Sequence, residues 1–265
     1  MIAYLAALSA ALCWAFGGLI AVTPVHRLGP IGFNKIRMPL VFVMLCLMTF
    51  AIEGWDSLQS WFWWYIIASS VIGIFLGDSA LFYTMNMIGP RRTSILFATN
   101  APMTAIISFI VFGEALSIWQ MLGCSIVIAG VMLAIVYGTT SNQKHRWEQI
   151  RGNAILGISA GLLAALCQAS GAIIIKPVME QGGNPVAISA LRVGISSMFL
   201  ITAGWIIPGK QSHRKYEKPT LKLVVWVGFS GFIGMALGMT LLLFGLSRGE
   251  AGIVTTLSAT SPVLM

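Results

Sequence analysis

Eight long apolar runs constrain the fold of this 265-residue chain more than any other feature. The runs cover 3–23, 36–52, 62–84, 93–112, 117–138, 154–175, 186–207 and 221–246, and a ninth begins at Gly252. A helix of about 20 residues crosses a hydrocarbon core about 30 Å thick. Lipid offers no partners to backbone polar groups, and the runs are continuous rather than alternating, so they predict membrane-spanning helices. We therefore expect an all-α integral membrane protein.

The overall composition agrees with this expectation. Hydrophobic residues make up 57% of the chain and charged residues 9%, against about 45–50% and about 25% in soluble domains. The first run has no basic segment before it and is too long for a signal peptide, so we expect it to remain as a helix. The four cysteines lie inside apolar runs without C-x-x-C spacing, which favours small buried residues over metal or redox sites. We expect no metal and no cofactor.

A motif in the third run returns in the eighth. Residues 71–83 (VIGIFLGDSALFY) correspond to 232–244 (FIGMALGMTLLLF), and each copy is followed by a turn, an apolar run and a proline, Pro102 or Pro262. The two copies are five runs apart, so the second must cross the membrane in the opposite sense. Such inverted repeats are typical of secondary transporters. The pattern predicts a ten-helix inverted-repeat (5+5) bundle.

The repeat also predicts the organisation of the chain. Residues 1–138 form the first five-helix repeat, 139–153 a basic connecting loop, and 154–265 a second repeat that ends within helix 9. In the first copy 36 residues follow Pro102 as far as Gly138, whereas three follow Pro262. We therefore expect the natural sequence to continue beyond Met265 with the rest of helix 9 and a helix 10.

Basic residues are concentrated on one side of the predicted bundle. Of the 16 lysines and arginines, 13 lie in or beside the connections 1–2, 3–4, 5–6 and 7–8: Arg27, Lys35, Arg37, Arg91, Arg92, Lys144, Arg146, Arg151, Lys210, Arg214, Lys215, Lys218 and Lys222. By the positive-inside rule this side is cytoplasmic, including the loops 139–153 and 208–222, and the N-terminus is outside. We expect a multi-pass protein of a cell membrane, in a bacterium the inner one. Because the net charge of +8 is scattered over separate loops, nucleic-acid binding is not indicated.

Two serine motifs match hydrolase patterns by letter only. Residues 157–161 fit G-x-S-x-G, and 228–231 resemble the serine motif of intramembrane proteases. The three histidines, His26, His145 and His213, all fall in predicted loops, so neither serine has a base, and the strand–turn–helix setting is absent. We expect no enzyme activity. The paired glycines of these motifs and of the repeat instead favour close helix packing.

Asp78 is the polar residue that stands out within the predicted spans. It lies about 24 Å along the third run at 1.5 Å per residue, and an ionisable group at the bilayer centre costs about 2.5–3.5 kcal/mol on insertion scales. One interpretation is a proton or cation site, or a gate paired with Arg37 or Arg192. The alternative is a structural carboxylate bonded to a neighbour. The corresponding residue in the second copy is Met239.

Other candidates for a substrate pathway follow from the repeat. Asn100 precedes Pro102, which predicts an interrupted helix that presents polar groups near the midplane, although Asn100 could equally bond to a neighbouring helix. Pro262 predicts the same interruption in the second copy. Trp14 and Gln168 occupy matching places in helices 1 and 6, and Arg37 and Arg192 in helices 2 and 7. For each of these, an anchoring or packing role remains open beside substrate contact.

A family resemblance rests on residues 113–131. The segment GEALSIWQMLGCSIVIAGV resembles the G-E-x-L-x-x-x-Q-x-x-G pattern that closes each half of the EamA family in the drug/metabolite transporter superfamily. Gly77-Asp78, Ile88-Gly89 and Pro102 also fit this family. The resemblance implies ten helices, a central cavity lined by helices 1, 3, 4, 6, 8 and 9, and alternating access. Glu114 falls at the family's loop glutamate, where we expect it to favour the N-terminus of helix 5.

Together these features predict a membrane carrier for a small organic metabolite or drug-like compound, with protons as a candidate coupling ion. Its expected partners are that small molecule and membrane lipid. The alternative is a non-transporting sensor or assembly subunit on the same fold, because fold does not prove function. The residues leave the substrate, the direction of transport and the oligomeric state open.

Overall fold

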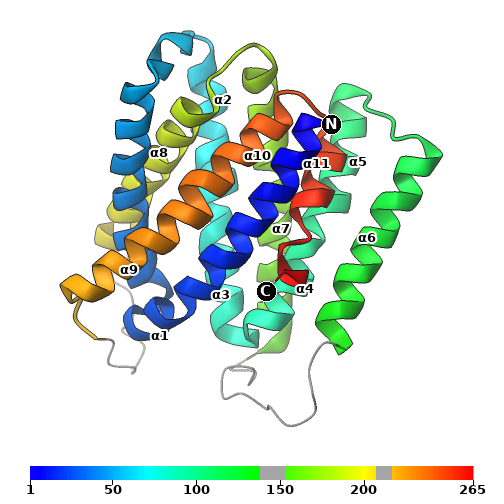
Figure 1. Ribbon diagram of the computed structural model, residues 1–265. Helices are drawn as coiled ribbons and strands as arrows, with labels where there is room; N and C mark the ends of the chain where they lie inside the picture. Colours follow the sequence, from blue (N-terminus) through cyan, green and yellow to red (C-terminus); the bar gives the residue numbers. More distant parts are fainter. Residues whose placement is uncertain (138–152, 207–216, 265) are drawn as a thin grey trace.

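The computed structural model describes residues 1–137, 153–206 and 217–264. Within these ranges the chain is helical and has no strand. The helices run up and down between the two ends of a bundle (Figure 1). The basic loop predicted over 139–153 lies outside the described residues apart from Asn153, as does most of the loop predicted over 208–222.

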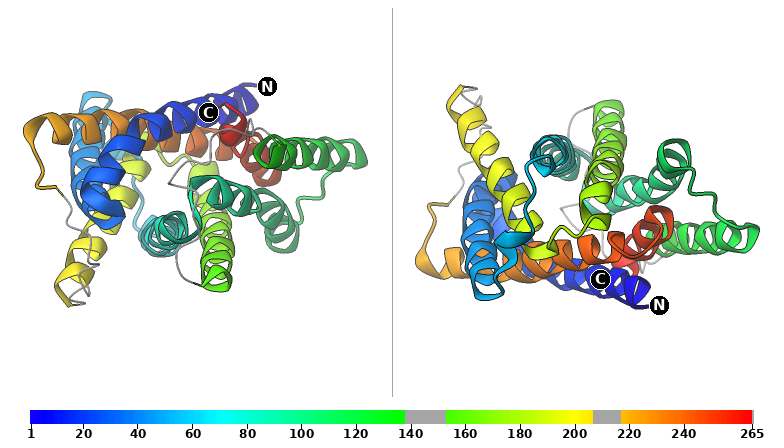
Figure 2. Two further views of the ribbon diagram at one scale, coloured as in Figure 1. Left: turned by 90° about the horizontal axis from the view of Figure 1, so that it is seen from below. Right: turned by 90° about the horizontal axis from the view of Figure 1, so that it is seen from above.

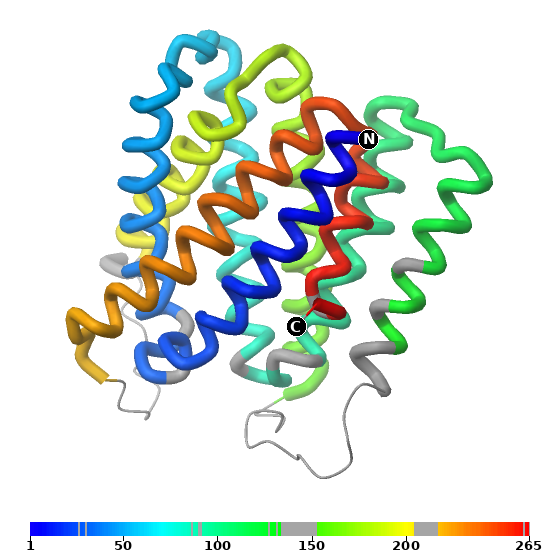
Figure 3. Tube along the Cα trace, in the orientation of Figure 1, coloured from blue at the N-terminus to red at the C-terminus, as the bar shows by residue number. Residues whose placement is uncertain are grey.

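The first repeat begins with a helical hairpin. The helix α1 (Ile2–Ala51) contains the first two predicted spans, because the chain reverses within it at Gly29, which has φ 74° and ψ 161°. Glycine is favoured at this positive φ, and the following Pro30 suits the first position of a new helix. Figure 3 shows the two arms of α1 separating from this turn. A short turn, η1 (Gly54–Ser57), then leads to the third span.

The third span is one continuous rod made of α2 (Phe62–Ser69), the π-helical segment η2 (Ser70–Leu76) and α3 (Gly77–Ile88). The chain then reverses at Gly89 with φ 86°, again before a proline. The fourth span comprises α4 (Pro90–Ala98) and α5 (Asn100–Phe112), and the fifth is α6 (Ile118–Tyr137).

The second repeat follows the same order. Its spans are α7 (Ala154–Glu180), α8 (Pro185–Ile206), and a third rod of α9 (Leu221–Gly231), the π-helical segment η3 (Phe232–Leu237) and α10 (Gly238–Leu246). The chain continues through α11 (Ala251–Ser258) into the 3₁₀ turn η4 (Ser261–Val263). A π-helical segment therefore occurs in the middle of the third span of both repeats, exactly where the sequence motif repeats.

Seven of the described helices are long and apolar enough to cross a membrane, and α6 contains a shorter apolar stretch. The predicted spans are thus confirmed within a few residues. The largest departures among these seven are at the start of the second arm of α1, which is Ile31 rather than residue 36, and at the end of α7, which is Glu180 rather than residue 175. The Gly29–Pro30 turn is so short that Lys35 lies inside the helix instead of in a loop, and Arg37 lies in the same helix, as predicted.

Each repeat packs its third span on the first span of the other repeat. The first arm of α1 lies along the α9–α10 rod, and α7 lies along the α2–α3 rod. The second arm of α1 packs on α8, so the two second spans also meet. The helix α6 lies at the periphery of the bundle (Figure 2), where it contacts α4 and α11.

Glycines bring the crossing helices into backbone contact at two equivalent points. A Cβ added at Gly17 would lie 2.6 Å from the Cα of Gly234, and one at Gly171 would lie 2.6 Å from the Cα of Gly73. At both crossings a serine donates to the glycine carbonyl: Ser230 to Gly17 at 2.8 Å and Ser69 to Gly171 at 2.7 Å. The prediction that the glycine pairs allow close packing is confirmed.

The serine-motif glycines of the sixth span also serve packing. A Cβ at Gly157 would lie 2.5 Å from Ile88, and one at Gly161 would lie 2.6 Å from Leu96. These glycines let α7 approach the turn between α3 and α4. Bulkier residues there would push the two repeats apart.

Candidate functional site

An ion pair joins the second and third spans of the first repeat. Arg37 Nη2 lies 2.9 Å from Asp78 Oδ2. Both side chains are largely buried, with 15% of Arg37 and 22% of Asp78 exposed. The pairing partner that the sequence left open is therefore Arg37, and Ser79 instead donates to the carbonyl of Phe75. A charge-assisted bond of this kind offsets much of the cost of placing a carboxylate inside a membrane span.

Two aromatic rings enclose the Arg37 guanidinium. Its Cζ lies 5.1 Å from the ring centroid of Phe33 and 5.4 Å from that of Phe82, and the two rings are 6.3 Å apart in an edge-on arrangement. Phe33 lies one helical turn before Arg37, and Phe82 one turn after Asp78. With this spacing, one ring from each of the two helices reaches the guanidinium. The cation–π contacts further stabilise the buried cation.

Arg192 occupies the equivalent place in the second repeat, but its surroundings differ. Its side chain is buried, with the residue 3% exposed, and Nη1 lies 3.3 Å from Met239 Sδ. Among the described residues, no carboxylate lies within ion-pair distance of Arg192, and its buried Nε has no hydrogen-bond partner. Asp78 is near enough to interact with it electrostatically at longer range. The structure thus gathers Arg37, Asp78 and Arg192 into one region of the bundle.

Trp14 and Gln168 flank this region from the first spans of the two repeats. Trp14 Nε1 lies 2.7 Å from the point that a Cβ of Gly238 would occupy, so its indole covers the residue before Met239. Gln168 is half-buried, next to Cys167, whose Cβ lies 3.4 Å from the Cβ position of Gly77. Gly77 precedes Asp78 as Gly238 precedes Met239. Trp14 therefore contacts the repeated motif directly, and Gln168 is the residue next to one that does.

The helix interruption predicted near Asn100 is present. The helix breaks at Thr99, whose hydroxyl donates to the carbonyl of Leu96 at 2.6 Å, and the buried Asn100 amide donates to Phe97 O at 2.6 Å. The bond to a neighbouring helix considered for Asn100 is not what the structure shows, because the amide satisfies a carbonyl of its own span. Pro102 lacks an N–H, so it leaves the carbonyl of Ala98 without its helical donor and weakens the helix at this turn.

The second copy repeats this break. The Thr260 hydroxyl donates to Leu257 O at 2.7 Å, as Thr99 does to Leu96. Pro262 follows within the 3₁₀ turn η4. The interruption is therefore a property of the repeat unit.

A second polar cluster lies where α5 and α7 end and α11 begins. Lys176, near the end of α7, is 2% exposed and forms ion pairs with Glu114 and, at 3.1 Å, with Glu180. Its Nζ also lies 5.1 Å from the ring centroid of Phe112. This cluster was not predicted from the sequence, where Lys176 is one of the three basic residues outside the 13 that set the predicted orientation. A lysine followed four residues later by a glutamate in an apolar helix was the available signal.

Glu114 connects three elements of this cluster. Besides Lys176, its carboxylate accepts hydrogen bonds from the Ser108 hydroxyl and, at 3.1 Å, from the backbone N–H of Ala251 at the start of α11. The expectation that Glu114 favours the N-terminus of the fifth span, α6, is wrong. It stabilises the N-terminus of α11, which belongs to the other repeat, while Ser117 and Gln120 cap α6 reciprocally.

Gln120 extends the same contact between the repeats. Its Nε2 donates to Glu250 Oε2 at 3.2 Å, one residue before Ala251. The glutamate and glutamine of the 113–131 segment thus both hold the start of α11.

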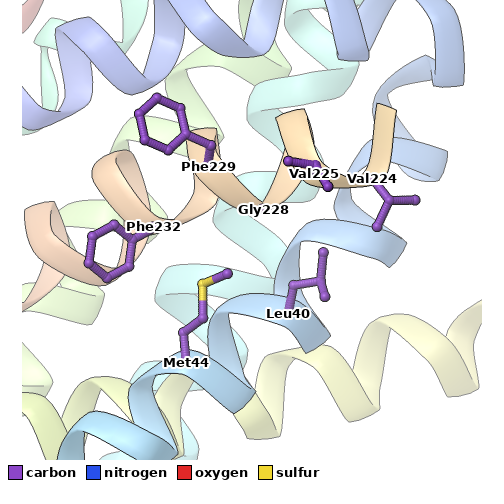
Figure 4. A pocket seen from close by; sticks show the side chains of 7 residues that line it. All are labelled: Leu40, Met44, Val224, Val225, Gly228, Phe229 and Phe232. Carbon is purple, nitrogen blue, oxygen red and sulfur yellow. The ribbon is translucent and has the colours of Figure 1, made fainter. Parts of the chain in front are cut away.

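A separate groove on the bundle surface is wholly apolar. Its volume is about 390 Å³, and it lies between the second arm of α1 and α9 (Figure 4). Its lining residues are Leu40, Met44, Val224, Val225, Gly228, Phe229 and Phe232. Without a polar group, this groove offers no means of orienting a polar solute. In the described part of the chain no group of three or more His, Cys, Asp or Glu side chains is placed to hold a metal ion.

The fold and the buried charges define a multi-pass membrane protein built from two repeats in the manner of secondary transporters. The family profile described as the EamA-like transporter family matches residues 1–136 and 155–265. The chain therefore belongs to the EamA family of the drug/metabolite transporter superfamily.

Structural comparison agrees with this fold. A solved crystal structure with 14% sequence identity superimposes with a TM-score of 0.79, covering 99% of this chain and 85% of its own. At this identity the likeness concerns the fold alone. A comparison with curated protein sequences found no match.

Proposed function

We propose that the protein carries a small organic metabolite or drug-like compound across a cell membrane by alternating access, and has no catalytic activity. The observation that carries this proposal is the buried group of Arg37, Asp78 and Arg192 where the two repeats meet, in a chain of a transporter family. Ionisable groups inside membrane spans are costly and mark pathways for solutes or protons. Residues 1–138 and 154–265 would act as the two inverted units, joined by 139–153.

The helix crossings supply the pivots for this motion. At Gly17–Gly234 and Gly73–Gly171 the backbones touch, so few side chains resist a change of crossing angle. In the proposed cycle, the paired first and third spans rock about these points. The two equivalent crossings would let either end of the bundle open in turn.

The Glu114 cluster would hold one end closed. Opening that end separates Glu114 from Lys176 or from Ala251, which belong to α7 and to the start of α11. Ion pairs that break and reform in this way are a common means of setting two states of similar energy. By the positive-inside argument this end faces the outside, and the end with Arg27, Lys218 and Lys222 faces the cytoplasm.

Asp78 is the proposed site of proton coupling. Its carboxylate reaches Arg37 and is accessible enough, at 22% exposure, to exchange protons when the pair opens. Protonation would release Arg37 and so link proton movement to the positions of the second and third spans. Trp14, Gln168 and Asn100 would line the neighbouring pathway, and Pro102 and Pro262 would allow their helices to bend.

The experiment that tests the proposal compares the metabolites released by cells that contain or lack the protein. A carrier changes the external level of at least one small molecule, and Asp78→Asn, which keeps the shape but loses the ionisable group, reduces that change. A non-transporting sensor or assembly subunit on the same fold would leave every external level unchanged at equal protein abundance in the membrane.

A further inference from the structure

The buried site contains more positive than negative charge. Arg37 and Arg192 contribute two guanidinium groups, and Asp78 is the carboxylate that the described residues place with them. Asp78 is bonded to Arg37, so Arg192 is left with a thioether as its nearest polar contact. A guanidinium has five N–H donors, and a buried cation without a paired anion is unfavourable. The arrangement therefore favours the arrival of an anion from outside the protein.

A comparison of the two repeats shows which chemical group is missing beside Arg192. Arg192 corresponds to Arg37, and Met239 corresponds to Asp78, because the two copies of the motif align Gly77-Asp78 with Gly238-Met239. Met239 Sδ lies 3.3 Å from Arg192, just as Asp78 Oδ2 lies 2.9 Å from Arg37. The second repeat thus has the arginine in the same place but a thioether where the first repeat has a carboxylate. A carboxylate at Arg192 would restore the symmetry of the two halves.

The first ion pair is the more exposed edge of the site. Arg37 and Asp78 are partly exposed, whereas Arg192 and Met239 lie deeper, with 3% and 8% exposure. An anion that approaches the Arg37–Asp78 pair meets a second cation behind it. Trp14 covers Gly238, so an indole also borders the position next to Met239. These neighbours offer an apolar surface to the rest of an organic molecule.

We propose that Arg192, with Arg37 beside it, binds the carboxylate group of a small organic anion that the protein carries. The fork of N–H donors on a guanidinium matches the two oxygens of a carboxylate, and such bonds are strong where water is excluded. The proposal rests on the carrier function proposed above and narrows the substrate class to carboxylates.

The test uses the purified full chain in detergent and measures its melting temperature with acetate, succinate, citrate or benzoate as sodium salts. Sodium chloride at equal ionic strength is the reference. At a concentration ten times the Kd, a bound carboxylate raises the Tm by about 4 °C. The expected result is such a rise with at least one of the four salts. Arg248→Gln, which removes an exposed arginine outside the site, retains the rise.

Two variants make the test specific to Arg192. Arg192→Gln removes the guanidinium and is expected to abolish the rise. Met239→Asp supplies an internal carboxylate to Arg192, so it is expected to raise the Tm of the free protein and to reduce the response to added carboxylate. That reduction must exceed the one in Met239→Asn, which has the same shape without the charge. If Arg192→Gln does not fold, the comparison of Met239→Asp with Met239→Asn still tests whether Arg192 binds the carboxylate.

The outcomes separate this proposal from the carrier function. If none of the four salts raises the Tm, or if Arg192→Gln and Met239→Asp respond as the wild type does, the carboxylate site is wrong, and measured metabolite flux would still support a carrier. If the Tm responds as expected but no carboxylate is transported in vesicles, the binding site is supported and the carrier function fails.

Discussion

The helix crossing at Gly171 provides a sharp test of how this bundle is held together. In Gly171→Ala the new Cβ would lie 2.6 Å from the Cα of Gly73, about 0.8 Å closer than the 3.4 Å at which ordinary contact begins. The obstructing atom belongs to the backbone, so no side-chain rotation relieves the overlap. The α7 and α2–α3 rods must therefore separate.

The expected cost follows from two contributions. Overpacking of this kind destabilises by about 1–3 kcal/mol. Separation of the rods also weakens the 2.7 Å bond from Ser69 to the Gly171 carbonyl, and hydrogen bonds between membrane helices contribute about 0.6 kcal/mol on average. The higher helix propensity of alanine offsets up to about 1 kcal/mol of this destabilisation. We expect a net destabilisation of about 1–3 kcal/mol.

A matched control is available in the same protein. Gly123 lies in α6, and a Cβ there would meet no atom within 4 Å among the described residues, so Gly123→Ala is expected to be neutral or slightly stabilising. Thermal unfolding in detergent, followed by circular dichroism, compares the two variants with the wild type. Gly17→Ala, at the equivalent crossing of the other repeat, should resemble Gly171→Ala. Equal melting temperatures for Gly171→Ala and Gly123→Ala would refute the close-contact argument.

Three further predictions concern charge. Asp78→Asn is expected to leave the protein inserted but to abolish flux or remove its dependence on a pH gradient, and wild-type flux with unchanged pH dependence would exclude the proton-site role. Lys176→Met leaves the Glu114 carboxylate without its cation at a largely buried position. We therefore expect the free energy of unfolding to fall by about 3–5 kcal/mol, as for other broken buried ion pairs. Thermal unfolding measures this loss, and an unchanged Tm would contradict it. Cysteines placed at Lys218 and Gln181 in a cysteine-free background should differ in intact cells, with a membrane-impermeant thiol reagent labelling only Gln181→Cys; the reverse pattern would invert the orientation.

The spans and the repeat could be predicted from the sequence because lipid imposes a strong and simple constraint. Apolar length locates each helix, and the motif around Gly73 and Gly234 marks the helix that the other repeat contacts. The π-helical segments were not predicted. A π-helix leaves no clear compositional signal, and it is recognised only from the backbone of both copies.

The polar contacts were harder to predict, because they join residues far apart in the sequence. The charge on Asp78 called for a partner, but the choice of Arg37 over Arg192 depends on which helix approaches on which face. Glu114 illustrates the same limit. Its position near the start of helix 5 suggested a local role, whereas its carboxylate reaches across to Ala251, 137 residues later. The spacing of Ser117 and Gln120 matches a capping box, but this cap was not predicted and was recognised only in the structure.

Counterflow in proteoliposomes tests directly whether the two repeats alternate to carry a solute. Liposomes containing the purified protein are loaded with the metabolite whose external level the protein changes in cells, and the entry of an isotope-labelled trace of that compound is followed. If the repeats alternate, internal loading accelerates entry through the wild type, and Asp78→Asn reduces this exchange. Entry at the same rate in loaded wild-type liposomes and in protein-free liposomes would contradict alternation.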